Sequence, residues 1–181
     1  MSKLPLTPPF TVISGGQTGA DLAGLLAAQD AGIFTTGWAP RGYKTEKGPQ
    51  PLLGSRFNLV EHEDSGYGGR TEANVRDSQF TLIFAPQSDS AGTKKTVDAC
   101  HQYDRGYLLI TELTPAVAAH ITATLFLMRV QILNIAGNRE TVSPGLCKKV
   151  RAFLKPILTH HLNQIQHMPR RTPRKPSGAT S

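Results

Sequence analysis

The stretch Ile13-Ser14-Gly15-Gly16-Gln17-Thr18-Gly19-Ala20-Asp21 decides the fold, because it joins a predicted strand directly to a predicted helix. Residues 10–13 are mostly β-branched and predict a short buried strand. A helix is predicted over residues 19–31, where leucines recur at helical spacing and Gly32 supplies the stop. A strand that passes through glycines into a helix is typical of the first half of a βαβ unit.

The rest of the chain repeats this alternation of strand and helix. Further strands are predicted at residues 33–38, 80–85, 107–110 and 130–135, with a short extended piece at 56–60. Helices are predicted at residues 70–78 and 93–103, from Thr114-Pro115, and from Ser143-Pro144 through residue 158, while residues 66–69 are predicted to form a flexible loop. Such alternation indicates a parallel sheet covered on both faces. The sequence therefore predicts one α/β domain over residues 1–163, a Rossmann-like three-layer domain with a mainly parallel sheet of about five or more strands.

Composition is that of a soluble globular protein. The chain has 181 residues, of which 39% are hydrophobic and 18% charged, as expected for a single domain. It contains no run of about 18 apolar residues that would predict a membrane span. The N-terminus lacks the apolar core of a secretory signal, and Cys100 and Cys147 form no disulfide framework. We therefore expect a cytoplasmic protein that does not contact a membrane.

The positive charge is concentrated at one end. The net charge is +7, and residues 168–181 carry four arginine or lysine residues and no acid, which leaves +3 for the rest of the chain. Residues 164–181 are predicted to be a basic, disordered tail because proline and small polar residues dominate there. Contact with nucleic acid is expected only through this tail.

The opening loop, Ser14 to Asp21, has the composition of an anion-binding turn. Glycines allow a ligand to approach the backbone, and the first N–H groups of the following helix attract negative charge. The loop is not a Walker motif, because no Gly-Lys-Ser/Thr follows, and it does not match G-x-G-x-x-G. The second strand ends in Trp38-Ala39-Pro40-Arg41, without the acid that binds the ribose of NAD. A dinucleotide dehydrogenase is therefore not expected.

Ligands of such sheets bind at the carboxyl ends of the strands, so the later strand-ending loops supply further candidates. Arg41 follows the second strand and can pair with phosphate, whereas Trp38 fits either base stacking or the core. Arg70, Asn74 and Asp77 share one face of a predicted helix, which suits a polar ligand or a solvated surface.

The segment Gly92-Thr93-Lys94-Lys95-Thr96 begins another helix and forms a second candidate anion site. Asn138, after the last strand, can close over the ligand, as can Asn134 and Arg139. The candidate binding residues are Ser14, Gly15, Gly16, Gln17, Thr18, Gly19, Asp21, Trp38, Arg41, Arg70, Asn74, Asp77, Gly92, Thr93, Thr96 and Asn138. No catalytic residue is assigned, and the spacing of histidines and cysteines predicts no bound metal ion.

Five segments occur in an order that resembles a known family. They are Val12-Ile13-Ser14-Gly15-Gly16-Gln17-Thr18-Gly19-Ala20-Asp21, Gly37-Trp38-Ala39-Pro40-Arg41-Gly42, Arg70-Thr71-Glu72-Ala73-Asn74-Val75-Arg76-Asp77-Ser78, Ala91-Gly92-Thr93-Lys94-Lys95-Thr96, and Leu133-Asn134-Ile135-Ala136-Gly137-Asn138-Arg139-Glu140. Together they resemble the family of proposed molybdenum carrier proteins within the SLOG (DprA/LOG-related) superfamily of Rossmann-like proteins. The likeness extends from about Phe10 to Phe153.

The resemblance implies a nucleotide-derived ligand held between the first glycine loop and the Gly92-Thr93 loop. Relatives in the carrier family are proposed to hold molybdenum cofactor, a pterin with a phosphate tail. The cytokinin-activating LOG enzymes of the superfamily cleave an N-glycosidic bond and carry Pro-Gly-Gly-x-Gly-Thr-x-x-Glu, in which the glutamate is catalytic. Here Thr96 stands where that glutamate would be, and Ala91 replaces a glycine usual in the carrier family.

Three functions remain open at this point. The first is a binding protein for a phosphorylated nucleotide-like ligand, with molybdenum cofactor as one candidate. The second is a nucleotide N-glycosidase of the phosphoribohydrolase type, which needs a carboxylate near the bond: Asp21, Glu46, Glu72 or Asp77. The third is a nucleic-acid-binding module. The resemblance also implies a homo-oligomer, a dimer or tetramer, and apolar residues of the segment Thr114–Met128 fit either the core or a subunit interface.

Overall fold

Short apolar segments of the chain form the central sheet of the computed structural model, which describes residues 9–63 and 67–167. The strands are β1 (Thr11–Ile13), β2 (Phe34–Ala39), β5 (Leu59–Glu61), β6 (Phe80–Phe84), β7 (Gly106–Ile110) and β8 (Ile132–Gly137). They pair in the order β5-β2-β1-β8-β6-β7, and every pairing is parallel. The predicted Rossmann-like α/β fold is thus confirmed, with six strands in this sheet. The disordered tail was predicted to begin at residue 164, but residues 164–166 form the end of the helix Leu146–Gln166. The rest of the predicted tail, from residue 168 onward, lies outside the described residues.

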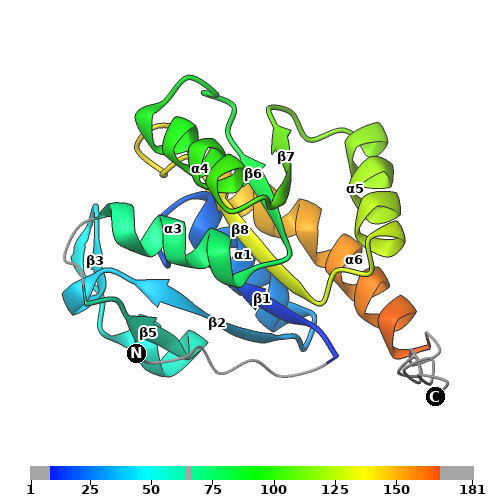
Figure 1. Ribbon diagram of the computed structural model, residues 1–181, viewed down its shortest axis with the longest axis horizontal. Helices are drawn as coiled ribbons and strands as arrows, with labels where there is room; N and C mark the ends of the chain where they lie inside the picture. The colour runs from blue at the N-terminus through cyan, green and yellow to red at the C-terminus, as the bar shows by residue number, and fades with distance from the viewer. Residues whose placement is uncertain (1–8, 64–66, 168–181) are drawn as a thin grey trace, which may run out of the picture.

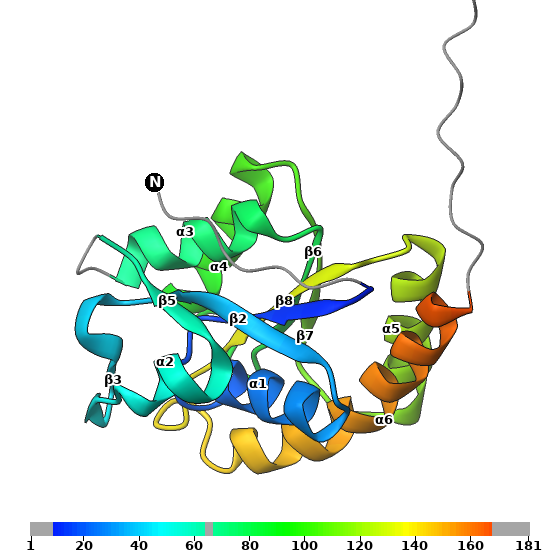
Figure 2. The ribbon, with the colours of Figure 1, turned by 90° about the horizontal axis from the view of Figure 1, so that it is seen from below.

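Helices cover both faces of the sheet (Figures 1 and 2). On one side are α1 (Ala20–Asp30) and α6 (Leu146–Gln166), which pack against each other, and α5 (Pro115–Leu127) packs on α6. On the other side are α3 (Tyr67–Asp77) and α4 (Ala91–Gln102), also in mutual contact. The result is the three-layer arrangement that buries a parallel sheet on both faces.

Alternating side chains of β6 belong to two different hydrophobic clusters, one on each face of the sheet. Leu82 and Phe84 pack with the residues of α1, α5 and α6, whereas Ile83 between them packs with Val75 and Cys100 on the opposite face. This is the two-residue period of a strand whose both faces are buried. Gly24 of α1 lies so close to β8 that a Cβ there would be 2.5 Å from Ile135, which is why this helix has a glycine in its interior.

Two elements differ from the sequence prediction. The residues predicted as an extended piece from 56 begin instead in the short helix α2 (Leu52–Phe57), which Asn58 ends by adopting a left-handed conformation, with φ 54°. Asn58 then anchors the turn, because its Nδ2 donates to the carbonyl oxygen of Thr35. Residues 67–69, predicted to be a flexible loop, form the first turn of α3 despite two glycines.

The remaining differences concern boundaries and one small hairpin. The predicted loop after β2 contains a 3-10 turn (Arg41–Tyr43) and a two-stranded hairpin, β3 (Lys44–Thr45) with β4 (Gly48–Pro49). The last strand begins and ends two residues later than predicted, α4 begins two residues earlier, and α6 begins at Leu146. No described helix is both long enough and apolar enough to cross a bilayer.

Candidate functional site

A cavity of about 330 Å³ opens at the carboxyl ends of three neighbouring strands, β1, β8 and β6. The segments that follow these strands form three of its walls, and α3 forms the fourth. Its lining residues are Gly15, Gln17, Asp21, Arg70, Thr71, Asn74, Ser90, Ala91, Gly92, Lys95, Thr96, Asn134, Ile135, Ala136, Gly137, Asn138, Arg139, Thr141 and Val142. This is where parallel α/β sheets bind ligands, and the volume lies at the lower end of the range of about 300–1,000 Å³ for small-molecule sites.

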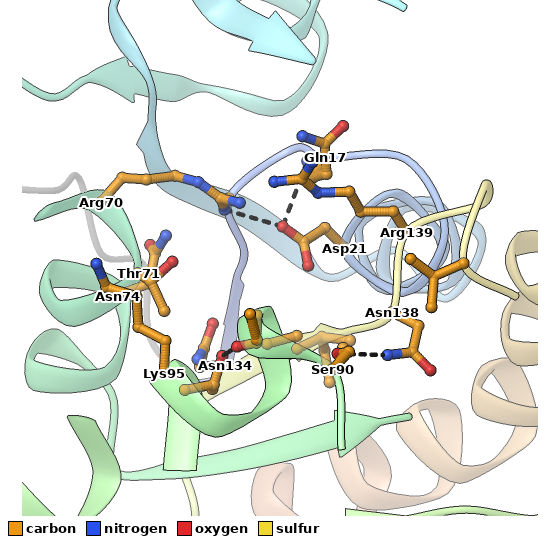
Figure 3. A pocket seen from close by; sticks show the side chains of 18 of the residues that line it. Gln17, Asp21, Arg70, Thr71, Asn74, Ser90, Lys95, Asn134, Asn138 and Arg139 are labelled. Carbon is orange, nitrogen blue, oxygen red and sulfur yellow. Dashed lines mark hydrogen bonds and ion pairs between the residues drawn. The ribbon is translucent and has the colours of Figure 1, made fainter. Parts of the chain in front are cut away.

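A buried ion pair lies at one end of the cavity, where Figure 3 shows Gln17 and Arg139 close by. Nη1 of Arg70 is 2.9 Å from Oδ2 of Asp21, and both side chains are at least 90% buried. Oδ2 also accepts a hydrogen bond from the backbone N–H of Gln17, at 3.3 Å. Burial raises the pKa of the Asp21 carboxyl, although the positive charges of Arg70 and Arg139 act in the opposite direction.

Two glycines make room for the cations of the cavity. A Cβ on Gly15 would lie 1.3 Å from Nη1 of Arg70, so only glycine lets the ion pair lie against this backbone. A Cβ on Gly68 of α3 would lie 2.1 Å from Nζ of Lys95, which extends from α4. The close approach predicted for the first loop therefore exists, but at Gly15 it accommodates a protein side chain.

Most backbone N–H groups around the start of α1 have partners within the protein. The N–H of Ala20 donates to the carbonyl oxygen of Asn138 at 3.0 Å, and that of Thr18 donates to Oε1 of Gln17, also at 3.0 Å. The N–H of Gln17 donates to the Asp21 carboxylate. An internal carboxylate thus occupies the place that the sequence analysis assigned to a ligand anion.

The start of α4 is more open. Ser90 caps this helix, because its Oγ accepts a hydrogen bond from the backbone N–H of Thr93. Ala91 and Gly92 follow; both are exposed and line the cavity, and the first N–H groups of a helix have no acceptor within it. Nothing lies within 4 Å of the position that a Cβ on Gly92 would take. Asn138 fixes the loop from the other side, since its Nδ2 donates to Oγ of Ser90 at 3.1 Å (Figure 3).

The structure brings half of the predicted binding residues together around this cavity. They come from four segments far apart in the sequence. They are Gly15, Gln17, Asp21, Arg70, Asn74, Gly92, Thr96 and Asn138. The other eight do not line it: Ser14, Gly16, Thr18, Gly19, Trp38, Arg41, Asp77 and Thr93.

Trp38 and Asp77 lie outside the cavity because they bond to each other. Nε1 of Trp38 donates to Oδ2 of Asp77 at 2.7 Å, and the indole packs with Ile13 and Ala73. Asn74 holds the backbone of the same tryptophan, accepting from its N–H and donating to its carbonyl oxygen, both at 2.9 Å. Trp38 is therefore a core residue and is not available to stack on a ligand base. Arg76 and Trp38 donate to Asp77 and keep the pKa of its carboxyl below the ordinary value, against the effect of burial.

Most of the other predicted binding residues that lie outside the cavity take part in the packing of loops. Ser14 donates to the carbonyl oxygen of Ile135 at 2.6 Å, and Thr18 bonds to the carboxylate of Glu46. A Cβ on Gly16 would be 2.7 Å from Leu59, and one on Gly19 would be 2.3 Å from the carbonyl oxygen of Asn138.

The last two predicted binding residues outside the cavity, Arg41 and Thr93, differ in solvent exposure. Arg41 is exposed in the 3-10 turn that follows β2. Thr93 is buried, and its hydroxyl bonds to Ser90 at 2.8 Å.

Sequence reasoning missed several cavity residues. Lys95 lies between two residues that were chosen, and its position one turn after Ala91 would have placed it on the cavity side of α4. Thr71 follows Arg70 and was passed over because only every third or fourth residue of α3 was considered. Thr141 and Val142 follow the last strand in an irregular loop, and no pattern of the sequence marks them.

The described residues contain no group of three or more His, Cys, Asp or Glu side chains that could hold a metal ion. Both cysteines are free thiols outside the cavity lining. Burial raises the pKa of each thiol above its ordinary value.

Comparisons with known proteins found one family and one similar solved structure. The model of the circularly permutated YpsA SLOG family matches residues 12–158, a range that includes the whole cavity lining. The crystal structure of a "Putative molybdenum carrier protein" from Syntrophus aciditrophicus SB is similar, with 32% sequence identity and a TM-score of 0.70. That match covers 86% of this chain and 93% of the other chain. The search of curated proteins gave no match.

Proposed function

Since the chain belongs to the circularly permutated YpsA SLOG family, we propose that it binds a small phosphorylated, nucleotide-like ligand in the cavity at the carboxyl ends of β1, β8 and β6. The observation that carries the proposal is the open start of α4 beside Lys95. The similar structure from Syntrophus aciditrophicus SB supports a carrier or binding role, because its name describes a carrier protein.

The start of α4 is the best place in the cavity for a phosphate. The N–H groups of Ala91 and Gly92 point out of the helix, and the partial positive charge of its N-terminus favours an anion. Lys95 lies one turn further along the helix and lines the same cavity. The start of α1 is less suitable, because Asp21 already accepts from Gln17 and Arg70 there and its negative charge repels a phosphate.

Molybdenum cofactor is a candidate cargo, and the side chains of the cavity limit how it would be held. The described lining has nitrogen and oxygen donors and no thiol, and thiolate is among the soft ligands that transition metals prefer. Lys95 and the start of α4 would hold the phosphate tail, and amide side chains would contact the pterin. The metal itself would then be bound by the cofactor and not by residues of the described lining.

Substitution of Gly92 tests the phosphate site with little risk to the fold. Space is open at this position, so both Gly92→Asp and Gly92→Asn fit without a clash, but only the aspartate places a negative charge at the start of α4. In calorimetric titrations with the four ribonucleoside 5′-monophosphates, we expect Gly92→Asp to weaken binding about 100-fold, whereas Gly92→Asn weakens it about tenfold or less. Equal affinity of the two variants would contradict the phosphate site.

A hydrolase is the second candidate, because one buried carboxylate lies in the cavity. Of the carboxylates considered from the sequence, only Asp21 lines it; Asp77 bonds to Trp38, and Glu46 bonds to Thr18. Burial raises the pKa of Asp21, as suits a general acid or base. Thr96, at the position of the LOG glutamate, donates its hydroxyl to the carbonyl oxygen of Gly92 and has no carboxylate to offer.

The hydrolase candidate predicts cleavage of an N-glycosidic bond by water. The sugar carbon would gain the hydroxyl group of water, and the base would leave with the proton. Incubation with nucleoside monophosphates, followed by chromatography, would detect the released base. If release occurs in the native protein and stops in Asp21→Asn, the protein is an enzyme; absence of release across the panel rejects this candidate.

A further inference from the structure

The amide group of Gln17, a residue of the cavity lining, is fixed in one orientation and has an unused donor. Its Oε1 accepts hydrogen bonds from two backbone N–H groups, those of Thr18 at 3.0 Å and Glu46 at 2.9 Å. These two donors determine which end of the amide is oxygen and which is nitrogen. The residue is 3% exposed and lines the cavity, and Nε2 has no acceptor among the described residues. Buried donors without an acceptor are rare in folded proteins, so a molecule in the cavity is expected to supply one.

An acceptor lies at the same end of the cavity. The hydrogen bonds from Gln17 N–H and from Arg70 to the Asp21 carboxylate both end on Oδ2, and within the described residues Oδ1 remains available for a ligand donor. A carboxylate accepts hydrogen bonds and repels anions, so the ligand group here is neutral. It must also present a donor beside an acceptor, since Gln17 Nε2 and Asp21 Oδ1 have opposite requirements.

The character of the lining favours sugar hydroxyls over a base for this position. None of the described side chains that line the cavity is aromatic, and Trp38, the nearest candidate in the sequence, is in the core. Bases are usually bound with an aromatic side chain against one face, whereas hydroxyl groups need only hydrogen-bonding partners, and each hydroxyl both donates and accepts.

We propose that Gln17 and Asp21 bind the vicinal hydroxyls of a phosphorylated pentose. One hydroxyl donates to Oδ1 of Asp21, and its neighbour accepts from Nε2 of Gln17. The cavity then holds the sugar-phosphate half of the ligand, and the base lies toward the opening. This inference rests on the proposed function, because the start of α4 supplies the phosphate contact. It also distinguishes a ribonucleotide from a pterin phosphate that lacks ribose.

Ligand analogues test the inference on the unaltered protein. The full chain is titrated with the four ribonucleoside 5′-monophosphates, then with the 2′,3′-dideoxy form of the tightest binder and with ribose 5-phosphate. We expect the dideoxy analogue to bind at least about tenfold more weakly, since it loses both hydrogen bonds. Ribose 5-phosphate is expected to displace the nucleotide, because it retains every group that the cavity contacts.

A substitution of Gln17 assigns the effect to its amide. Gln17→Glu keeps the oxygen that accepts from Thr18 and Glu46 but removes the NH₂ donor. We expect about tenfold weaker binding of the ribonucleotide, and a much smaller further loss for the dideoxy analogue than in the unaltered protein. Gln50→Glu makes the same chemical change at an exposed residue outside the cavity and should leave affinity unchanged.

The outcomes separate this inference from the proposed function. If the dideoxy analogue binds as well as the ribonucleotide, or if ribose 5-phosphate fails to displace the nucleotide, the hydroxyl site is wrong while the phosphate site stands. If no nucleotide and no ribose 5-phosphate binds, both are wrong. A misfolded Gln17→Glu would not alter these conclusions, because the analogues are tested on the unaltered chain.

Discussion

At the scale of single residues, Gly16 and Gly92 show that glycines in similar sequence contexts can have different structural roles. Both lie in glycine-containing loops that precede helices, and both were predicted to contact the ligand. Gly16 has φ 71°, and a Cβ there would lie 2.7 Å from Leu59 in the core between α2 and β5. Gly92 has open space around it and lines the cavity. Gly16 is therefore required for folding, and Gly92 is a position where a ligand can approach.

The two glycines should respond differently to aspartate. Gly16→Asp is expected to lower the free energy of unfolding by about 1–3 kcal/mol from backbone strain alone, with more from the clash with Leu59. Gly92→Asp is expected to change it by about 0.5 kcal/mol or less, as is usual for surface positions. Urea denaturation of both variants measures the difference. Similar losses of stability would contradict the packing described for Gly16.

His161 adds a pH dependence far from the cavity. It is fully buried, Nε2 bonds to the carbonyl oxygen of Val130 at 2.8 Å, and Nδ1 has no partner among the described residues. Burial, with a smaller contribution from neighbouring His160, lowers the pKa of His161. In the unfolded chain the pKa is about 6.5, so below that pH the unfolded state binds more protons than the folded state.

The free energy of unfolding should therefore fall as pH decreases from about 6.5 toward the folded pKa of His161. The loss is at most about 1.4 kcal/mol per pH unit for one proton. His161→Gln removes the titrating ring and keeps a donor for Val130, so its stability should depend less on pH between about 7 and 5. His160→Gln, at an exposed neighbour, should retain most of the dependence, because burial is the larger cause of the lowered pKa of His161. Parallel pH profiles of the His161 variant and the native protein would exclude this role.

The sequence predicts which residues lie near the site better than it predicts where their side chains point. Asp21, Arg70 and Gln17 were expected near the ligand because they follow a strand or begin a helix, and the cavity contains all three. Trp38 and Ser14 are equally close in sequence to strand ends, but each turns toward a bonding partner, Asp77 and Ile135 respectively. Those partners are 39 and 121 residues away, so no local pattern contains the information.

At the scale of elements, the β3–β4 hairpin links two walls of the cavity. The carboxylate of Glu46, in its turn, bonds to Thr18 after β1 and to the hydroxyl of Thr141 after β8. The backbone N–H of Glu46 donates to Gln17. Burial acts to raise the pKa of Glu46, but the hydrogen bonds from Thr141 and Thr18 keep it below its usual value. The hairpin thus fixes Gln17 and Thr141, which both line the cavity.

Removal of this link should weaken ligand binding without altering the cavity lining. We expect Glu46→Ala to bind the tightest ribonucleoside monophosphate several-fold more weakly, because Thr141 loses its anchor and the hairpin its attachment to Thr18. Glu46→Gln, which can still accept these hydrogen bonds, should lose less. Glu63→Ala, an exposed glutamate outside the cavity, is the control. Calorimetric titration measures all three, and unchanged affinity in Glu46→Ala would show that the hairpin does not support the site.

The long strands and helices were predictable because their patterns are local. The apolar run at residues 80–84 and the proline after Thr114 mark β6 and the start of α5, and the structure contains both. The hairpin and α2 were not predicted, since they consist of two-residue strands and one six-residue helix. Such elements depend on tertiary contacts: Asn58, which ends α2, bonds to Thr35 of β2. The two glycines of α3 misled the prediction, and one of them, Gly68, lies against the side chain of Lys95.

At the scale of the whole molecule, α5 presents an uncharged outer surface. Ile121 and Leu125 of this helix are buried in the core, but Ala123 is exposed and Leu127 is 78% exposed. Met128, which follows, is 54% exposed. No residue of α5 is acidic or basic apart from His120. An exposed apolar surface of this kind is typical of a subunit contact, so we propose that α5 mediates homo-oligomer formation.

A charged residue on this surface should separate the subunits. The native chain is expected to have at least the mass of a dimer in light scattering coupled to size-exclusion chromatography, and Ala123→Glu is expected to shift it toward the monomer. Ala152→Glu makes the same change at an exposed alanine of α6 and serves as the control. A monomeric native chain, or an Ala123→Glu variant with unchanged mass, would reject an interface at α5.

The cavity at the carboxyl ends of β1, β8 and β6 unites segments from Gly15 to Val142, and its proposed occupant is a phosphorylated ligand. Native mass spectrometry of the gently purified full chain tests this most directly, because it weighs whatever the protein carries. We predict a bound small molecule that contains phosphate, retained in Gly92→Asn and lost in Gly92→Asp. A bound molecule without phosphate, or equal retention in the two variants, would contradict the proposed binding site.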